Sequence, residues 1–440
     1  MRMVDLISKK KQGEALTNPE IDFIVTGFVD GSVPDYQMAA FLMTVYFKGM
    51  SAEETTALTL AMARSGERMD LSAIEGIKAD KHSTGGVGDK TTLIVAPIVA
   101  ACGVKVAKMS GRGLGFTGGT IDKLESVKGF RTDLSTREFI ETVNQIGICV
   151  TGGTKDLAPA DKKIYALRDV IGAVDNIPLI ASSIMSKKLA SGADCIVLDV
   201  KTGSGAFMKS VEESILLSEM MVNIGHLAGK KVSALVTDMD IPLGNSVGNQ
   251  LEIMEAVHTL QGNGEKRLTQ LCLTLAATML MLAGAGDKTA CEAKAADALY
   301  SGKAFEKLCE LVTAQGGDAA VIRDAALFTP ASVVYELKAE QSGYIGRMDT
   351  EKIGIASMLL GAGRETKDSV IDFSAGIKIM KKTGDYVKQG EALAILYTSD
   401  QGLLQQASEK YTESVTFTTE KPPETPLIYA FVEKDHIIKY

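Results

Sequence analysis

Residues 93–109, LIVAPIVAACGVKVAKM, hold the pattern that decides the fold. An apolar helical run at 93–102 is followed at once by a strand-like run at 104–109. Helical stretches separate three further strand-like runs, at 146–150, 195–200 and 232–236. Near-continuous hydrophobic strands that alternate with helices are typical of a parallel sheet covered on both faces. We therefore expect a mixed α/β domain with a mainly parallel sheet, whose ligands bind at the carboxyl ends of the strands.

The first 70 residues carry helical patterns and no strand pattern. Asn18 followed by Pro19 has the residue types of an N-cap and a first helical position. Ser51 with Glu54 forms a capping box for the next amphipathic helix. Such helices bury an apolar stripe, so we expect a helical domain here.

A third texture begins near Val334. The segment 376–398, GIKIMKKTGDYVKQGEALAILYT, alternates with period two and contains the turn signals Gly384-Asp385 and Gln389-Gly390. It resembles the barrel-sandwich of biotinyl and lipoyl carrier domains, which present a modified lysine just after such a strand. Residues 397–400 are Tyr-Thr-Ser-Asp, so we expect a structural appendage and not a carrier.

Residues 159–192 lie between two predicted strands and again read as helices. We therefore expect them to complete the helical domain together with the first helical segment, which leaves a cleft between this lobe and the α/β lobe. The expected domains are a helical domain of 1–70 with 160–192, an α/β domain of 71–159 with 193–333, and a C-terminal α+β barrel-sandwich-like domain of 334–440.

Composition excludes several classes of protein. Of 440 residues, 45% are hydrophobic and 23% charged, which is ordinary for a globular chain and rules out disorder. A net charge of −8 without a long basic tract argues against a nucleic-acid partner. The apolar stretch 271–286 is shorter than the ~20 residues of a membrane span and reads as a buried helix. Six dispersed cysteines without a CxxC pair and no secretory signal fit reduced thiols, so we expect a cytoplasmic protein without a membrane partner.

A first glycine-rich segment, KHSTGGVGDKTT at 81–92, precedes the helical run. Glycines let backbone N–H groups converge on one spot, and a helix N-terminus behind them favours phosphate. Lys81 adds a charge, and Ser83 and Thr92 add hydroxyl donors. The segment is not a Walker A loop, because Asp89 precedes the lysine. The alternative is a flexible turn with surface lysines.

A second glycine-rich segment, KMSGRGLGFTGGT at 108–120, directly follows the strand-like run. It matches GxGxxG, but no strand ending in an acid follows, as a dinucleotide site requires. Lys108, Ser110 and Thr120 instead suit the same anion. Residues 78–112 contain six Lys or Arg against two Asp, a local charge of +4. A solvated basic face is the alternative.

A third group of polar residues lies in the second helical segment. Ser183 and Lys187 share a helix face, and Arg168 sits on the preceding helix. Converging donors of these types suit a planar ligand with carbonyl groups, although each could also be a surface or capping residue. His82 lies inside the first glycine-rich segment, and its unperturbed pKa of about 6.5 would let it donate a proton or a hydrogen bond. The other three histidines, 226, 258 and 436, read as structural.

These motifs carry a resemblance. The run 110–125, SGRGLGFTGGTIDKLE, is similar to the signature of thymidine and pyrimidine-nucleoside phosphorylases, and KHSTGGVGD at 81–89 is similar to their phosphate loop. The resemblance covers essentially the whole chain, including ASSIMSKK at 181–188. It implies a cytoplasmic homodimer. The helical domain would form the dimer interface and bind the pyrimidine base. It also implies reversible phosphorolysis of pyrimidine (deoxy)nucleosides to free base and (deoxy)ribose 1-phosphate, for nucleoside salvage and catabolism.

Motif position then implies roles for individual residues. Phosphate would be held by Lys81, Ser83, Thr92, Lys108, Ser110 and Thr120. The pyrimidine would be held by Arg168, Ser183 and Lys187, with His82 near its carbonyl as hydrogen-bond donor or acid. The catalytic residues would be His82, Arg168 and Lys187. Phosphate is the nucleophile and a co-substrate, so no cofactor is expected. Because the two sets lie in different lobes, domain closure is expected to bring them together.

Two positions depart from the family's pattern. Phe116 stands where many members have His. Lys90 stands where some bacterial relatives have a Thr that binds potassium together with Gly88, Leu243, Ser246 and Glu255. We expect the Lys90 ammonium to replace the cation and to pair with Glu255, so that no metal is bound.

Two rival functions remain from the sequence. An anthranilate-type phosphoribosyltransferase also binds phosphates on glycine-rich loops, but it would need acidic residues as magnesium ligands. The pyrimidine-binding residues and the C-terminal extension of this chain argue against that function. A carrier or scaffold would need the missing lysine. The preference among uridine, deoxyuridine and thymidine, and the direction of the reaction in the cell, are left open by the sequence.

Overall fold

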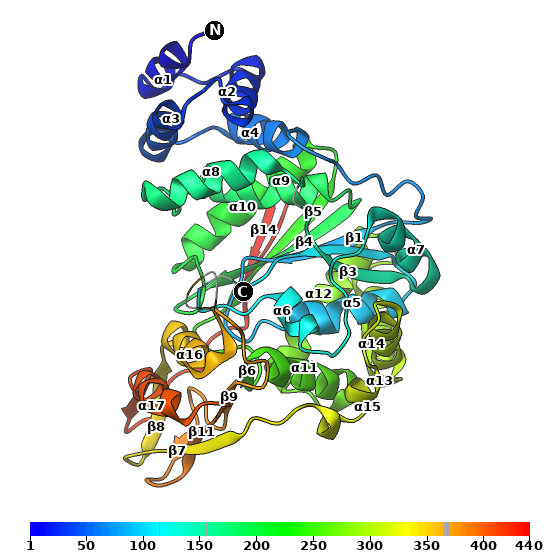
Figure 1. Cartoon of the computed structure of the whole chain (residues 1–440), viewed down its shortest axis with the longest axis vertical. Helices are drawn as coiled ribbons and strands as arrows, with labels where there is room; N and C mark the ends of the chain where they lie inside the picture. The colour runs from blue at the N-terminus through cyan, green and yellow to red at the C-terminus, as the bar shows by residue number, and fades with distance from the viewer. Residues whose placement is uncertain (114, 155, 365, 367–368) are drawn as a thin grey trace.

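The computed structural model describes residues 1–440 except 114, 155, 365, 367 and 368. Three parts follow one another along the long axis of the molecule: the N-terminal helices, a central α/β domain and a C-terminal domain (Figure 1). This is the α/β architecture with a separate helical domain that the sequence predicts.

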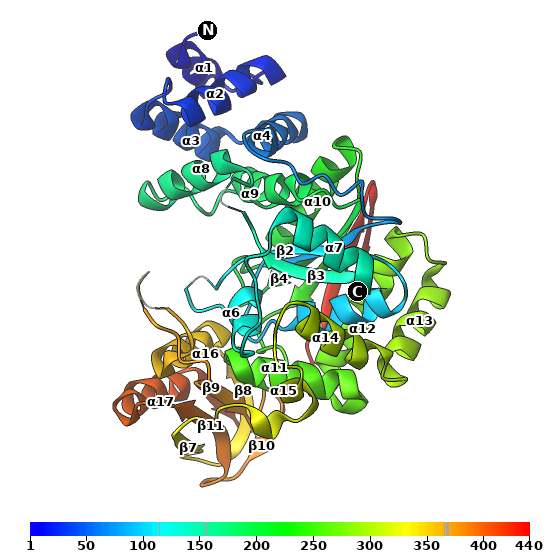
Figure 2. The same ribbon diagram turned by 45° about the vertical axis from the view of Figure 1, so that its right-hand side comes forward.

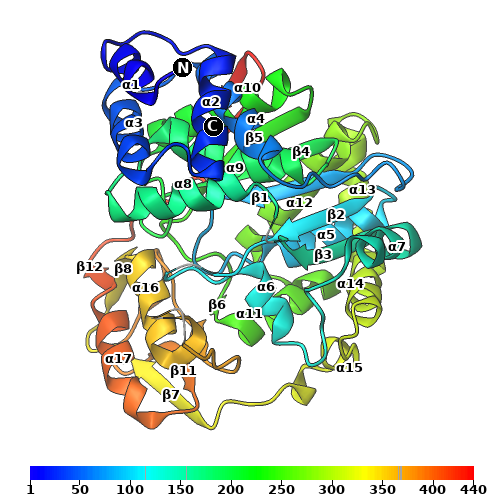
Figure 3. The same cartoon turned by 45° about the horizontal axis from the view of Figure 1, so that its top comes forward.

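The helical part joins two segments that are distant in the chain. It comprises α1 (Met3–Lys11), α2 (Asn18–Asp30), α3 (Asp35–Lys48), α4 (Ala52–Arg64), α8 (Pro159–Val170) and α9 (Ile177–Ala190). Ala160, Ile164 and Leu179 belong to the same hydrophobic cluster as Ile21 and Phe41. Helix α8 accordingly lies against the N-terminal helices in Figures 1 and 3.

The helix caps show one confirmation and one error of the sequence prediction. Ser51 and Glu54 form the expected capping box of α4. The N-cap of α2 is Thr17 and not Asn18, because Thr17 and Glu20 make a second capping box. The expected position was therefore wrong by one residue.

The central sheet has the strand order β1-β4-β5-β13-β14. Its strands are β1 (Ala79–Ser83), β4 (Cys195–Thr202), β5 (Lys231–Asp238), β13 (Ile428–Glu433) and β14 (His436–Lys439). Strands β1, β4 and β5 are parallel, and the sequence predicts β4 and β5 but not β1, whose residues overlap the first glycine-rich segment. Strand β2 (Val106–Ser110) with β3 (Ile148–Gly152) forms a separate parallel pair. An isolated bridge between Lys78 and Lys105 connects the pair to the sheet.

Helices cover both faces of this sheet, so alternate residues of β4 enter different cores. Cys195 and Val197 pack into the cluster that contains α5 (Thr91–Ala101) and α12 (Lys266–Leu282). Ile196 and Leu198 pack into the cluster that contains α9 and α10 (Val211–Leu227). The remaining helices of this domain are α6 (Thr120–Glu125), α7 (Thr136–Ile146), α11 (Asn249–His258), α13 (Lys288–Tyr300), α14 (Lys303–Ala314) and α15 (Ala320–Arg323).

The C-terminal domain is built from two small antiparallel sheets, β6-β9-β11-β7 and β10-β8-β12. Its elements are β7 (Val333–Lys338), β8 (Gly343–Met348), α16 (Thr350–Ser357), β9 (Gly376–Ile379), β10 (Tyr386–Val387), β11 (Ala392–Thr398), α17 (Leu404–Thr412) and β12 (Val415–Thr418). Their packed core matches the predicted barrel-sandwich texture of 376–398.

Two strands cross the expected border between these domains. Strand β6 (Ser246–Val247), from the central segment, pairs with β9 of the C-terminal domain. In return, β13 of the terminal segment pairs with β5 in the central sheet. The sequence analysis expected all of 334–440 in the C-terminal domain, but residues 428–439 complete the central sheet, because Ala430 and Val432 bury their side chains against α10 and β5.

The apolar stretch 271–286 forms most of α12, whose Leu271 and Leu275 are fully buried. All six cysteines are free thiols, as expected. Among the residues that the structure describes, no helix is long and apolar enough to span a membrane.

Candidate active site

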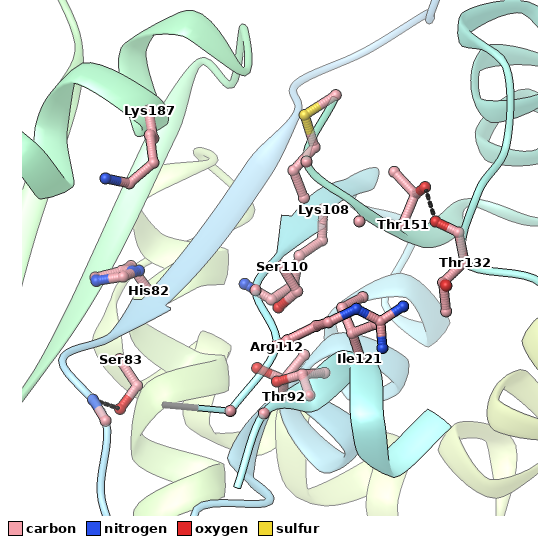
Figure 4. A pocket seen from close by; sticks show the side chains of 18 of the residues that line it. His82, Ser83, Thr92, Lys108, Ser110, Arg112, Ile121, Thr132, Thr151 and Lys187 are labelled. Carbon is pink, nitrogen blue, oxygen red and sulfur yellow. Dashed lines mark hydrogen bonds between the residues drawn. The ribbon is translucent and has the colours of Figure 1, made fainter. Parts of the chain in front are cut away.

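A cavity of about 950 Å³ opens where the sequence predicts a site, at the carboxyl ends of β1, β2 and β3. Helix α9 closes the cavity from the side of the helical domain. In Figure 4, Lys187 and His82 lie on one side and Thr92, Ser110 and Arg112 on the other. The predicted residues that line it are His82, Ser83, Thr92, Lys108, Ser110, Thr120 and Lys187.

The first glycine-rich loop turns sharply before α5. Gly85 and Gly88 have φ values of 95° and 73°, which L side chains rarely adopt. The Gly85 N–H donates to the Ser83 hydroxyl at 3.2 Å, and α5 begins directly behind the loop at Thr91. The orphan N–H groups and partial positive charge of a helix start therefore lie beside the cavity.

The second glycine-rich loop, residues 110–120, is called the signature loop below. Its two ends touch, because a Cβ on Gly119 would lie 2.1 Å from the Gly113 nitrogen. The Gly113 N–H donates to the Asp122 carboxylate at 2.6 Å, which fixes the loop to α6. Leu114 of the signature motif lies outside the described residues.

Below the loops lies a layer of buried charges. Asp80, fully buried on β1, contacts the Lys108 ammonium at 3.3 Å and the Lys188 ammonium at 2.7 Å. Burial alone would raise the pKa of Asp80, but these two ammonium groups lower it to about 2. Asp199 on β4 pairs in the same way with Lys201 at 2.7 Å.

Lys81 belongs to this layer of buried charges, and it is not among the described residues that line the cavity. Its ammonium donates to the Thr91 hydroxyl and lies 3.5 Å from Asp199 and 3.9 Å from Asp89. Lys108 lines the cavity and donates to the Lys81 carbonyl oxygen. Burial, together with the neighbouring ammonium groups, lowers the pKa of Lys108 to about 8 against the opposing effect of Asp80.

The structure changes the expected state of His82. Burial and the charges of Lys188 and Lys108 hold its pKa well below 6.5. The imidazole is therefore neutral at pH 7 and can donate a hydrogen bond from its N–H group, but it is not a proton donor in the ligand-free protein. The expected role as an acid rested on an unperturbed pKa.

The predicted base-binding residues are only partly brought together. Lys187 points into the cavity and its ammonium contacts the Asp161 carboxylate and, at 3.1 Å, the Ser183 hydroxyl. Arg168 is 1% exposed, and its guanidinium donates to the carbonyl oxygens of Ala173, Val174 and Leu179 at 2.6 to 3.0 Å. In this conformation Arg168 holds the α8–α9 loop and does not reach the cavity.

Sequence reasoning missed the acids and two of the lysines in the charged layer, and it missed Asp161. Asp199 interrupts the otherwise apolar strand β4, and a charge inside such a central strand is the signal that could have identified it. Asp80 lies in the polar strand β1, where the sequence offers no such signal. Lys188 and Arg112 also line the cavity. Lys201 is fully buried beneath it.

Lys90 is the residue that we expected to stand in place of a bound cation. Its fully buried ammonium lies 2.7 Å from Glu255, 2.7 Å from the Leu243 carbonyl oxygen and 3.0 Å from the Ser246 carbonyl oxygen. The expected pairing with Glu255 is confirmed. The ammonium occupies the centre of this oxygen cage, so the residues present do not fit a potassium ion. In the described part of the chain, no group of three or more His, Cys, Asp or Glu could hold a metal.

Comparison with protein families defines the class. Residues 4–66 match the helical bundle domain of the glycosyl transferase family, and residues 75–305 match its a/b domain. Residues 344–418 match the pyrimidine nucleoside phosphorylase C-terminal domain. Fold and site therefore define an enzyme that transfers glycosyl groups.

Individual relatives narrow this class. The chain is 50% identical over 430 residues to the pyrimidine-nucleoside phosphorylase of Geobacillus stearothermophilus, covering 98% of this chain and 99% of that protein. It is 52% identical to the enzyme of the same name from Bacillus subtilis, over 91% of this chain and 92% of that protein. The chain belongs to the pyrimidine-nucleoside phosphorylase family.

The fold is shared more widely. Anthranilate phosphoribosyltransferase from Thermus thermophilus superposes with a TM-score of 0.58 at 20% identity, covering 70% of this chain and 98% of that one. At this identity the likeness concerns the fold alone.

The pKa of Lys108 predicts a pH dependence. The ammonium is charged below about pH 8 and neutral above it, so kcat/KM for phosphate should fall as the pH rises through about 8. Initial rates at limiting phosphate from pH 6 to 10 measure this decline. The Lys108→Arg variant keeps its charge and should not show this decline. An identical decline in both proteins would contradict the assignment.

The oxygen cage predicts how cations affect stability. Lys90→Thr should open the cage, so that potassium at about ten times its Kd raises the free energy of unfolding by about 1.4 kcal/mol over sodium. The wild-type protein should not distinguish the two salts in thermal unfolding. Lys90→Met should lose about 3–5 kcal/mol without rescue by potassium, because Glu255 stays buried and unpaired. Wild-type activity that strictly requires potassium would contradict this.

Proposed function

We propose that this chain catalyses the reversible phosphorolysis of pyrimidine (deoxy)nucleosides, giving the free base and (deoxy)ribose 1-phosphate, in nucleoside salvage and catabolism. The observation that carries the proposal is the cavity itself, in which two glycine-rich loops with hydroxyl and ammonium groups face Lys187 of the helical domain. The membership of the family, at about half identity over nearly the whole chain, supports the same reaction.

The phosphate end needs no protein nucleophile, because phosphate attacks the anomeric carbon itself. The protein has to hold a dianion in line with the glycosidic bond. Ser83, Thr92, Ser110 and Thr120 all line the cavity, and their hydroxyls suit this role. Lys108 lines the cavity and Lys81 lies in the layer below it, and their charges lower the free-energy cost of bringing the anion in.

The base end has to stabilise negative charge on the departing pyrimidine. Lys187 supplies a positive charge at the cavity wall, and neutral His82 can donate a hydrogen bond to a pyrimidine carbonyl. Ser183 contacts Lys187 and would join the base as the lobes approach. Arg168 would have to exchange its bonds to the α8–α9 loop for bonds to the base, so this loop is expected to rearrange on binding.

The wider setting follows the same reasoning. The helical domain of 1–70 with 160–192 would bind the base and form the dimer interface, and 71–159 with 193–333 would bind phosphate. The C-terminal domain then begins at 334 and ends before 428–439, which complete the central sheet. A homodimer through the helical domain is supported by exposed Tyr36 and Phe47 on α3, which are 74% and 75% exposed. We place the protein in the cytoplasm, with a pyrimidine nucleoside and phosphate as its binding partners. We propose that it uses no cofactor and binds neither nucleic acid nor a membrane.

An ultraviolet assay tests the reaction. Protein mixed with uridine or thymidine and phosphate should release the base, and omission of phosphate should stop the release. Lys187→Ala should lower kcat/KM by roughly 100-fold or more, because the charge at the leaving base is lost. The exposed Lys162→Ala on α8 is the matched control and should keep full activity. Base release without phosphate, or an active Lys187→Ala protein, would refute the proposal.

Lobe closure is tested separately. Small-angle scattering should show a smaller radius of gyration when phosphate and a pyrimidine are both bound, because Arg168 and Ser183 lie outside the cavity in the present conformation. Crystal structures with and without these ligands should differ in the angle between the lobes. One identical form in all states would contradict closure.

A further inference from the structure

The signature loop rests on the C-terminal domain. Phe116 packs against the hydrophobic cluster of that domain, beside helix α16. The approach is close, since a Cβ on Gly354 would lie 2.7 Å from the Phe116 carbonyl oxygen and 3.0 Å from its ring. The loop that lines the phosphate end of the cavity is thus seated on a domain that the sequence analysis treated as an appendage.

A buried carboxylate makes a second connection. Asp122, 2% exposed on α6, accepts hydrogen bonds from the Gly113 N–H at 2.6 Å, from Arg112 at 3.2 Å and from Arg364 at 2.8 Å. Arg364 belongs to the C-terminal domain and follows α16 in the chain. Helix α6 lies at the border between the two domains in Figures 2 and 3.

The neighbouring residue ties the two glycine-rich loops together. Lys123 is 1% exposed and donates to the Asp89 carbonyl oxygen of the first loop at 2.8 Å and to the Gly118 carbonyl oxygen of the signature loop at 3.2 Å. Its charge is balanced by Glu252 of α11 at 2.9 Å. A shift of α6 would therefore be felt in both loops.

Of the two arginines that contact Asp122, Arg364 contributes more than Arg112 to stabilising the buried carboxylate. The Arg112 side chain is 52% exposed and shares its guanidinium with Glu125 at 2.5 Å, so solvent screens its contribution. The Arg364 side chain is 28% exposed and makes a charge-assisted bond to the nearly buried carboxylate. Without Arg364, the partners that Asp122 keeps among the described residues are the Gly113 N–H and the half-exposed Arg112 guanidinium.

We propose that Arg364 is a positioning residue for phosphate binding, which acts through Asp122 to hold Gly113 and the signature loop in the conformation that lines the cavity. A chain segment rich in glycine loses much conformational entropy when it is ordered. Contacts that order it before the ligand arrives reduce the cost of binding. The proposal rests on the phosphate site proposed above, because Ser110 and Thr120 stand at the two ends of this loop.

Steady-state kinetics of the full-length protein test the role. Arg364→Met should raise KM for phosphate roughly tenfold, as expected for one charge-assisted hydrogen bond, and change KM for the nucleoside less than about twofold. Arg364→Lys should recover most of the phosphate affinity, since a single bond to Asp122 is at stake. Exposed Arg347→Met on β8 of the same domain is the matched control and should leave both KM values unchanged.

A double-mutant cycle tests whether the effect passes through Asp122. Asp122→Asn should raise KM for phosphate, and adding Arg364→Met to it should cause little further change. Fully additive effects, an unchanged KM for phosphate in Arg364→Met, or an equal loss in Arg364→Lys would each overturn the proposal. Should Arg364→Met not fold, the Arg364→Lys and Asp122→Asn proteins still decide the matter.

A separate variant distinguishes failure of this proposal from failure of the phosphate site. Ser110→Ala should raise KM for phosphate whether or not Arg364 matters. If Ser110→Ala raises it and Arg364→Met does not, the positioning role alone is wrong. If Ser110→Ala has no effect either, the phosphate site is wrong and the positioning role falls with it.

Discussion

Two carboxylates buried under the glycine-rich loops constrain how the rest of the molecule is assembled. Asp80 and Asp199 have no exposed surface, and an isolated charge in that position would cost several kcal/mol. Each is tolerated because lysines pair with it: Asp199 pairs with Lys201 of its own strand and with Lys81 of β1. Lys108 comes from β2, and Lys188 comes from α9 of the helical domain, so the acid on β1 is paired only when three elements have docked.

This arrangement also orients the cavity. Lys188 is fixed by its ion pair with Asp80. Lys187, the preceding residue of the same helix, points into the cavity. Burial, together with the nearby charge of Lys188, holds the pKa of His82 well below 6.5 and lowers the pKa of Lys108. A chain with a net charge of −8 thereby presents a locally positive site to an anionic substrate, since charges close to the cavity outweigh distant surface acids.

The C-terminal domain is integrated with the central domain through exchanged strands. Strand β6 pairs with β9, and β13 pairs with β5, so each domain completes a sheet of the other. Phe116 and Asp122 extend this connection to the signature loop. A domain that carries no cavity-lining residue in the described part of the chain is in this way mechanically coupled to the site.

The sequence by itself determined the elements whose signals are local. Apolar runs, glycine-rich loops and capping boxes indicated the parallel strands other than β1, the hydroxyls that line the cavity and the helical segments. The predicted strand ends are displaced by about two residues, because propensity does not define where pairing stops. Only the tertiary structure decided what depends on contacts between distant residues. The burial of Arg168 against its own loop, the pairing of Asp80 with Lys188, the neutral His82 and the return of β13 to the central sheet all arise there. Charge pairing and pKa are set by neighbours in space and by exclusion of water, and neither is encoded in the spacing of residues along the chain.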